Sequence, residues 1–279
     1  MTVALPPALL QVAHLTMAYG AHVALNDVTL EVRPGEVHAV LGEEGAGKTT
    51  LMKIIGGYIP AGDYRGEMTL AGQPLAPKSI KEGLQSRVAL TPRLLAVFEH
   101  MSVADNVTMA SSELQRRFSL SRGKANAQAA AVLRHWEIPI PLSAHVAELS
   151  PMQRRQLMIA NALAIEPLLV VLDEPLAGMA DGRSISGIMR LIRRMAERGI
   201  ACLCLAGRPV DATLVADRIS VLRDGEIVGS WPRADFDEST LAAAMASQRA
   251  YDPDRAGRHA DFGERAGLLG WFKGGGHRP

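Results

Sequence analysis

The stretch from Gly42 to Thr49 constrains the fold of this chain more than any other part of its sequence. It follows the pattern G-x-x-x-x-G-K-[ST], after an apolar run typical of a strand and before one typical of a helix. Glycines allow the backbone N–H groups of such a loop to face phosphate oxygens, and the helix N-terminus adds positive partial charge. Lys48 supplies a cation for the β- and γ-phosphates, and the Thr49 hydroxyl can bind Mg²⁺. The alternative is a glycine-rich turn with a chance Lys-Thr pair, but the strand–loop–helix context favours a nucleoside triphosphate site.

A second stretch can complete such a site, because the apolar run Leu168–Leu172 ends in two carboxylates, Asp173 and Glu174. A continuous apolar run is typical of a buried parallel strand, whose C-terminal end delivers the chemistry in α/β proteins. We expect Asp173 to bind Mg²⁺, directly or through water, and Glu174 to polarise the attacking water. Such a run followed by Asp-Glu is weak evidence alone, but with the upstream loop it indicates a phosphate-loop NTPase.

The composition excludes several classes of protein. The 279 residues carry a net charge of +1 with 21% charged residues, which argues against a broad nucleic-acid-binding face. No apolar run approaches the roughly 18–20 residues that span a bilayer, and Met1–Leu10 lacks the features of a signal peptide. Cys202 and Cys204 alternate inside an apolar run and are expected to be inert core thiols. We therefore expect a cytoplasmic globular protein of one or two domains.

The order of the predicted elements indicates an α/β core with an insertion. Strands are predicted at 15–20 and 24–32, and a hairpin at 219–228 across an Asp-Gly turn. Between about 93 and 166 strand signals fade and alanine becomes frequent, which predicts an inserted helical subdomain. The four arginines of a helix predicted at 186–198 are interpreted as a solvent-exposed face.

At these residues the chain resembles the ATP-binding subunits of ABC transporters, over roughly residues 10–250. Tyr19 lies where that family stacks an aromatic ring on adenine. The stretch Leu149–Gln153 lies where the family has its L-S-G-G-Q signature, and Leu176–Asp181 fills the loop that crosses the family's dimer interface. The resemblance implies ATP and Mg²⁺ as ligands. It also implies a second nucleotide-binding domain, identical or different, across the bound nucleotide.

Within that family, the chain is most similar to the first nucleotide-binding domain of bacterial monosaccharide importers of the ribose, xylose and galactose type. The similarity lies at 24–28, 35–43, 62–67 and 216–225. Those ATPases usually carry two such domains, so we expect the second copy to come from another chain. The resemblance further implies an integral membrane permease and, indirectly, a periplasmic sugar-binding protein. It implies a peripheral location on the cytoplasmic face of the inner membrane, and no nucleic-acid partner.

The fold implied is an α/β P-loop NTPase core with an antiparallel β subdomain and an inserted α-helical subdomain. We expect a single nucleotide-binding domain over 1–250, with the helical subdomain at about 93–166. Residues 251–279 are rich in Gly, Arg and Asp without a sustained period, which predicts a disordered tail.

The loop pattern and the resemblance together give the candidate site residues. Glu174 is the predicted catalytic residue, and Thr49 and Asp173 are the predicted metal ligands. The predicted nucleotide-binding residues are Tyr19, Gly42, Glu43, Glu44, Gly45, Ala46, Gly47, Lys48, Thr49, Thr50, Ser150 and Gln153.

Two departures from the family concern groups that contact the γ-phosphate and its water. Arg93 lies where the family has a glutamine that touches Mg²⁺ and the attacking water, and an arginine offers donors only. Gly207 lies where the family has its switch histidine, and the neighbouring Arg208 is the only possible substitute.

Two further departures concern the backbone around the nucleotide. Pro151 and Met152 replace both glycines of the signature, so one N–H is lost and a side chain is added where a backbone must approach phosphate. Glu44 places a carboxylate in the phosphate loop, where it opposes a polyanion unless it points to solvent. Removing one γ-phosphate donor typically costs about 10²–10³ in rate. We therefore expect nucleotide binding to survive better than turnover.

Three functions fit these features to different degrees. The leading hypothesis is the ATP-binding component of a sugar-type ABC importer with reduced turnover. The alternative is a non-catalytic regulatory or structural subunit that pairs with a complete ABC ATPase and closes on ATP. A third, an ABC ATPase acting on nucleic acid or ribosomes, is disfavoured because the chain has neither paired domains nor a coiled coil.

Overall fold

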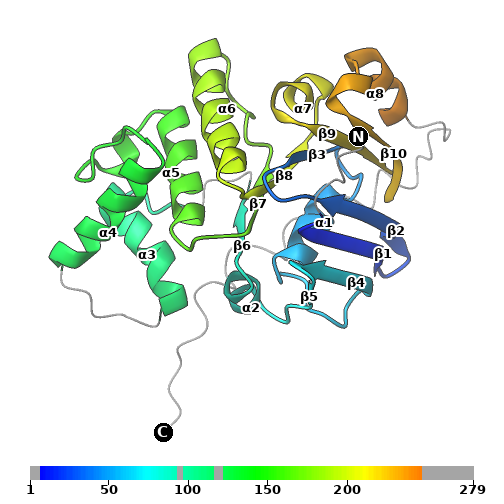
Figure 1. Cartoon of the computed structure of the whole chain (residues 1–279), viewed down its shortest axis with the longest axis horizontal. Coiled ribbons are helices and arrows are strands. Elements are labelled where there is room, and N and C mark those ends of the chain that lie inside the picture. Colours follow the sequence, from blue (N-terminus) through cyan, green and yellow to red (C-terminus); the bar gives the residue numbers. More distant parts are fainter. Residues whose placement is uncertain (1–6, 93–96, 116–121, 247–279) are drawn as a thin grey trace, which may run out of the picture. The chain divides into compact units, whose positions relative to one another are not determined.

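The computed structural model describes residues 7–92, 97–115 and 122–246 (Figure 1). Within these ranges the strands form two sheets, one of six strands and one of four. The larger sheet has the order β10-β9-β3-β8-β7-β6, and its pairs are parallel except for the β9–β10 hairpin. Its strands are β3 (Val37–Leu41), β6 (Val88–Thr91), β7 (Leu169–Asp173), β8 (Ala201–Ala206), β9 (Arg218–Arg223) and β10 (Glu226–Pro232). The hairpin confirms the turn predicted at Asp224-Gly225.

Two hydrophobic clusters cover the two faces of this sheet. Ala39 and Leu41 belong to one cluster and Val40 to the other, as the alternation of side chains along a strand requires. The first cluster also contains Cys202 and Cys204, and burial raises the pKa of both thiols, that of Cys204 to about 12. The prediction of buried core thiols is thus confirmed. Helices that contribute to the first cluster include α5 (Pro151–Leu163), α6 (Gly182–Glu197), α7 (Pro209–Val215) and α8 (Glu238–Met245).

The four-stranded sheet packs with helix α1 (Lys48–Ile55) in the second cluster. Its order is β2-β1-β4-β5, and every pair is antiparallel. Its strands are β1 (Leu10–Tyr19), β2 (His22–Val32), β4 (Arg65–Leu70) and β5 (Gln73–Pro74). This sheet is the predicted antiparallel β subdomain.

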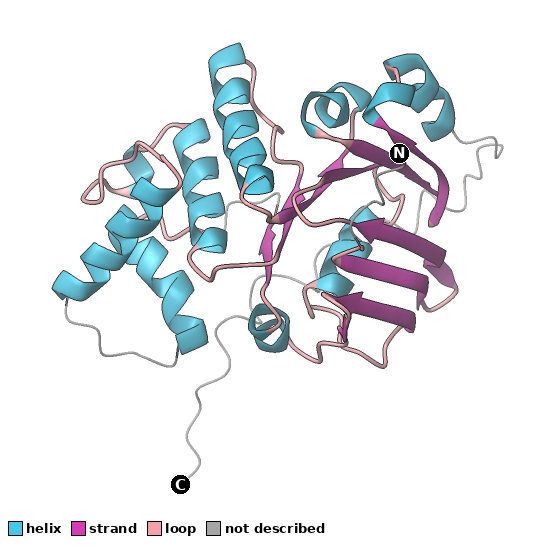
Figure 2. Ribbon diagram, in the orientation of Figure 1, coloured by secondary structure: helices cyan, strands magenta, loops and turns pink. Residues whose placement is uncertain are grey.

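The segment between β6 and β7 contains the predicted helical insertion (Figure 2). Its described helices are α3 (Val103–Gln115), α4 (Arg122–His135), the short η1 (Val146–Glu148) and α5. The predicted fold class is therefore confirmed. The boundaries proposed for the domain and the subdomain stay predictions, and the tail predicted over 251–279 lies outside the described residues.

The arginines predicted to form a solvent-exposed face at 186–198 do so only in part, since Arg190 and Arg198 are exposed but Arg193 and Arg194 are partly buried. Arg194 donates to the backbone carbonyl of Trp136 at 2.5 Å and pairs with Glu137 at 2.6 Å. The Arg198 guanidinium lies 4.9 Å from the centre of the Trp136 ring. Arg193 pairs with the Asp217 carboxylate at 2.9 Å. The prediction fails at Arg193 and Arg194 because periodicity identifies the polar side of a helix but not the segments that pack over it.

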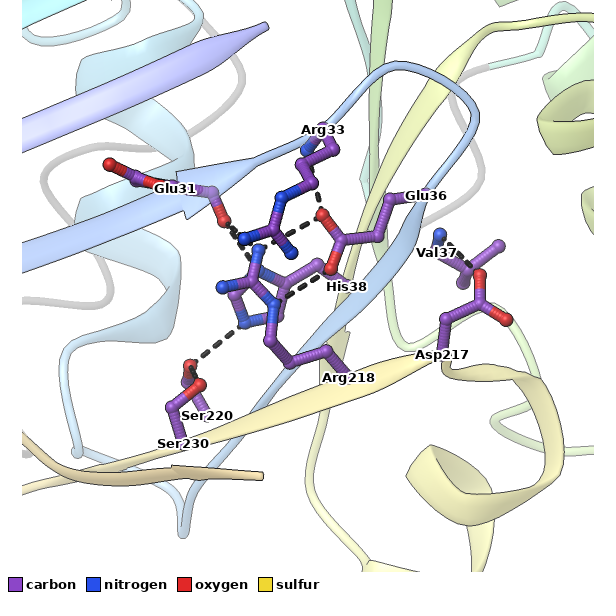
Figure 3. Close-up of polar contacts among 9 residues, drawn as sticks. All are labelled: Glu31, Arg33, Glu36, Val37, His38, Asp217, Arg218, Ser220 and Ser230. Carbon is purple, nitrogen blue, oxygen red and sulfur yellow. Dashed lines mark hydrogen bonds and ion pairs between the residues drawn. The ribbon is translucent and has the colours of Figure 1, made fainter. Parts of the chain in front are cut away.

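A buried polar cluster joins β2 to the first residues of β3 and β9 (Figure 3). The side chain of His38 is 1% exposed; its Nδ1 is 2.8 Å from the Glu31 carbonyl oxygen and its Nε2 is 2.8 Å from the Ser220 hydroxyl. Since a carbonyl only accepts, Nδ1 carries the proton and Nε2 accepts from Ser220. Arg218 donates to both carboxylate oxygens of Glu36, at 2.7 and 2.9 Å. This cluster fixes the start of the strand that leads into the phosphate loop.

The structure also contains two short helices that the sequence did not predict, α2 (Ile80–Gln85) and α7. Each has a local start signal. The Ser79 hydroxyl accepts from the backbone N–H of Glu82 at 3.3 Å, and Pro209 occupies the first turn of α7. Helices of six and seven residues are too short to show a sustained apolar period.

Candidate functional site

The phosphate loop connects β3 to α1, and its shape depends on glycine at two points. The backbone of Gly47 has φ 108°, and a Cβ there would lie 2.4 Å from the carbonyl oxygen of Ala24. A Cβ on Gly42 would lie 2.4 Å from the carbonyl oxygen of Leu222. Both distances are too short for a real Cβ, so the loop presses against neighbouring backbone where only glycine fits.

Lys48 is held inside this loop and is 8% exposed. Its ammonium donates to the carbonyl oxygens of Gly42, at 2.6 Å, and Glu43, at 2.8 Å. The Lys48 ammonium group therefore already lies in the loop that an anionic ligand would enter. Glu44 is exposed to solvent. As expected for an exposed position, its carboxylate need not oppose a bound polyanion.

The two predicted carboxylates lie at the same edge of the sheet as the loop. Asp173, which is 8% exposed, is in register with Leu205 of β8, and β8 also pairs with β3. The Gly42 N–H donates to the Ala206 carbonyl at 3.1 Å, and the Glu174 N–H donates to the Leu205 carbonyl at 3.0 Å. The end of β8 therefore separates the loop from the carboxylates by one strand. The C-terminal edge of a parallel sheet is the usual place for a ligand in α/β proteins.

Glu174 occupies space beside the position predicted for the switch residue. Its backbone is in the left-handed region, with φ 46°, and a Cβ on Gly207 would lie 3.2 Å from its Oε1. Arg208 turns to Asp211 instead, with N–O distances of 2.9 and 2.8 Å, and its side chain is 65% exposed. Arg93 lies outside the described residues.

The remaining predicted contacts come from other elements. The Ser150 hydroxyl accepts from the Gln153 N–H at 3.3 Å, and the Gln153 side chain accepts from the Ser150 N–H at 3.0 Å, which forms a capping box at the start of α5. Met152 faces α6, because a Cβ on Gly187 would lie 2.8 Å from its sulfur. The methionine therefore packs inward. Tyr19 lies at the end of β1 in the four-stranded sheet and is 39% exposed.

Sequence reasoning missed Arg155, which is 6% exposed and whose guanidinium is influenced by the charges of both carboxylates. Burial lowers the pKa of its guanidinium most strongly, while the charges of Asp173 and then Glu174 raise it. Its Nη1 is 3.4 Å from the carbonyl oxygen of Pro92. A signal was available, because Arg155 precedes the buried Ile159 by four residues and so lies on the same side of α5.

The oxygen atoms at this edge suit a hard divalent cation. A carboxylate on Asp173 and a hydroxyl on Thr49, the second residue of α1, are the donor types that Mg²⁺ prefers. Lys48 and the loop N–H groups suit the phosphates of a nucleotide. No described helix is both long and apolar enough to cross a membrane.

Comparison with known proteins agrees with this chemistry. A family model described as "ABC transporter" matches residues 25–177. The ribose import ATP-binding protein RbsA 2 of Rubrobacter xylanophilus is 34% identical over 233 residues, covering 83% of this chain and 44% of its own length. The xylose import ATP-binding protein XylG of Moorella thermoacetica is 29% identical over 237 residues, covering 85% and 47%. This chain thus spans less than half the length of these relatives.

Solved structures share the fold. The ADP conformation of MJ1267, an ATP-binding cassette of an ABC transporter, has a TM-score of 0.70 at 21% identity and covers 85% of this chain and 99% of its own. The dimeric post-hydrolysis state of the ATP-binding cassette MJ0796, bound to ADP and Pi, has a TM-score of 0.68 at 22% identity and covers 81% and 100%.

Proposed function

Since this chain belongs to the ABC transporter family, we propose that it is the ATP-binding subunit of an ABC importer and couples ATP binding and hydrolysis to a membrane permease. The proposed cargo is a monosaccharide, supported by the names of the ribose- and xylose-import relatives. The proposed location is peripheral, at the cytoplasmic face of the inner membrane. The observation that carries the proposal is the placement of the phosphate loop and Glu174 at one edge of the parallel sheet.

Each side chain of the edge has a proposed task. Lys48 and the loop N–H groups orient the β- and γ-phosphates, and Tyr19 stacks on the base. Thr49 and Asp173 hold Mg²⁺, which when bound neutralises charge on the phosphates. Glu174 accepts a hydrogen bond from the attacking water and takes its proton.

A second nucleotide-binding domain is part of the proposed transporter. Ser150 and Gln153, which now cap α5, contact the nucleotide held by that partner when the two domains close. The permease responds to this closure, and hydrolysis resets it. A periplasmic sugar-binding protein delivers cargo to the permease and does not contact this chain.

A non-catalytic regulatory subunit is the second candidate, and specific residues favour it. Gly207 has no side chain beside Glu174, and Arg208 is engaged with Asp211. Pro151 also has no N–H to offer a phosphate. These features weaken turnover without touching the loop that binds nucleotide.

An ATPase assay separates the two functions. The purified chain is assayed alone and with a complete nucleotide-binding domain of the sugar-importer type, each time beside Glu174→Gln. Turnover by the chain alone that disappears in Glu174→Gln contradicts the regulatory function. Turnover that appears only with the partner and falls when Glu174→Gln is placed in this chain supports an asymmetric catalytic pair. If the chain binds ATP but has no turnover alone, and Glu174→Gln in this chain does not change the turnover measured with the partner, the regulatory function is supported.

A further inference from the structure

Arg155 is a buried cation at the edge of the sheet that carries the proposed metal ligand. It lies in the second turn of α5, and its side chain is enclosed rather than extended into solvent. A buried guanidinium requires nearby negative charge or acceptors, because losing its hydration is costly. The acceptors that it reaches therefore indicate what it does.

The strand register places those acceptors. Thr91 of β6 is in register with Leu172 of β7, so Pro92 and Asp173 are the next residues along two neighbouring strands. Arg155 Nη1 contacts the carbonyl oxygen of Pro92 at 3.4 Å. The guanidinium therefore lies at the C-terminal ends of β6 and β7, on the side of Asp173 away from β8.

The electrostatics agree with this placement. The negative charges of Asp173 and Glu174 both act on Arg155, in that order. An arginine stays protonated at all physiological pH values, so the two carboxylates and Arg155 carry a net charge of −1 when both acids are ionised. A divalent cation arriving at Asp173 meets half of the negative charge that the two acids alone would offer.

We propose that Arg155 is a resident counter-ion of Asp173 and Glu174, and that it competes with the Mg²⁺ of Mg·ATP for their carboxylates. This inference rests on the proposed nucleotide-binding function. Arg155 acts through Asp173 and Glu174, so it is a positioning residue. Arg155 stabilises the ionised carboxylates before the nucleotide binds. It also reduces the increase in nucleotide affinity that Mg²⁺ produces. Because Arg155 and Ser150 lie on one helix, movement of α5 during domain closure changes this competition.

The test measures how much Mg²⁺ tightens nucleotide binding. The dissociation constant of a fluorescent ATP analogue is determined for the full chain in EDTA and in saturating Mg²⁺, and the ratio of the two values is compared between variants. Removing the positive charge weakens the metal-free complex and strengthens the metal complex, so both effects raise the ratio. We expect Arg155→Gln and the apolar Arg155→Met to raise it about tenfold.

Two controls leave a positive charge at position 155. Arg155→Lys retains the charge, and Arg154→Gln removes a charge from the adjacent residue, whose partner is Glu99. Both are expected to stay within about twofold of the wild-type ratio. Thermal denaturation of each variant checks folding, and the apolar replacement suits this buried position if glutamine destabilises it.

The outcomes distinguish the inference from its premise. A ratio that is unchanged or lower in both neutral variants overturns the counter-ion role. An equal rise in Arg154→Gln overturns it too, because the effect would then be general. If the wild-type chain binds no analogue under either condition, the proposed function itself fails.

Discussion

Replacing Gly47 with alanine tests whether the phosphate loop depends on contact with neighbouring backbone. A residue other than glycine in the left-handed region costs about 1–2 kcal/mol, and Gly47 has φ 108°. The added Cβ would also lie 2.4 Å from the Ala24 carbonyl oxygen and 2.8 Å from a methyl of Leu25. Relieving that overlap requires β2 or the loop to move, at a further cost of about 1–3 kcal/mol. We expect Gly47→Ala to lose about 2–5 kcal/mol of unfolding free energy.

Gly45 provides a matched control in the same loop. It has φ 85°, but a Cβ there would meet nothing within 4 Å. We expect Gly45→Ala to lose only the conformational cost, about 1–2 kcal/mol. Urea denaturation of both variants gives the comparison, and ATP affinity should fall at least about tenfold more in Gly47→Ala because Lys48 moves with the loop. Equal losses of stability and affinity in the two variants would refute the argument from close packing.

Three further predictions address the rest of the chain. Burial, with a smaller contribution from Arg218, holds the pKa of His38 at about 4 against an ordinary 6.5, so its stabilisation is present above pH 6.5 and declines as the pH falls toward 4. The loss between pH 7 and pH 4.5 is about 2 kcal/mol. In urea denaturation at those two pH values, His38→Gln should lose that much less than wild type, and equal losses would count against the assignment. Arg208→Ala should leave ATP turnover within about twofold, since its exposed ion pair contributes little. A tenfold fall in the same assay would make Arg208 a substitute for the switch histidine. Arg194→Ala should cost about 2 kcal/mol in thermal denaturation because two hydrogen bonds to the helical insertion are lost, whereas the exposed Arg190→Ala should cost under about 0.5. Similar losses in both would refute the structural role of Arg194.

The sequence was sufficient for features that consecutive residues specify. The phosphate loop needs glycines, a lysine and a threonine at fixed spacing, and the strand ending at Asp173 needs only an apolar run. Both stretches fold where they were predicted, and the parallel sheet brings them to one edge. The hairpin at Asp224-Gly225 was predictable for the same reason, since its turn chemistry is local.

Features that depend on what packs over a residue could not be predicted. Arg155 is one of two adjacent arginines in α5, and its role depends on strands β6 and β7, which are distant in sequence. Arg194 was assigned to a solvent-exposed face because Trp136, its partner, lies 58 residues away along the chain. Met152 was expected to obstruct a phosphate, but its side chain packs against Gly187 of α6. The roles of Tyr19, Ser150 and Gln153 stay predictions.

The measurement that tests the central claim most directly is ATP affinity, by titration calorimetry with Mg²⁺, for wild type, Lys48→Ala and Glu174→Gln. The account predicts that Glu174→Gln weakens ATP binding less than Lys48→Ala does, since Glu174 acts on water rather than on the phosphates. It predicts at least about tenfold weaker binding by Lys48→Ala, because a charge-assisted contact contributes about 1.5–3 kcal/mol. Absence of ATP binding by the folded wild-type chain, or equal affinity in Lys48→Ala, would contradict it.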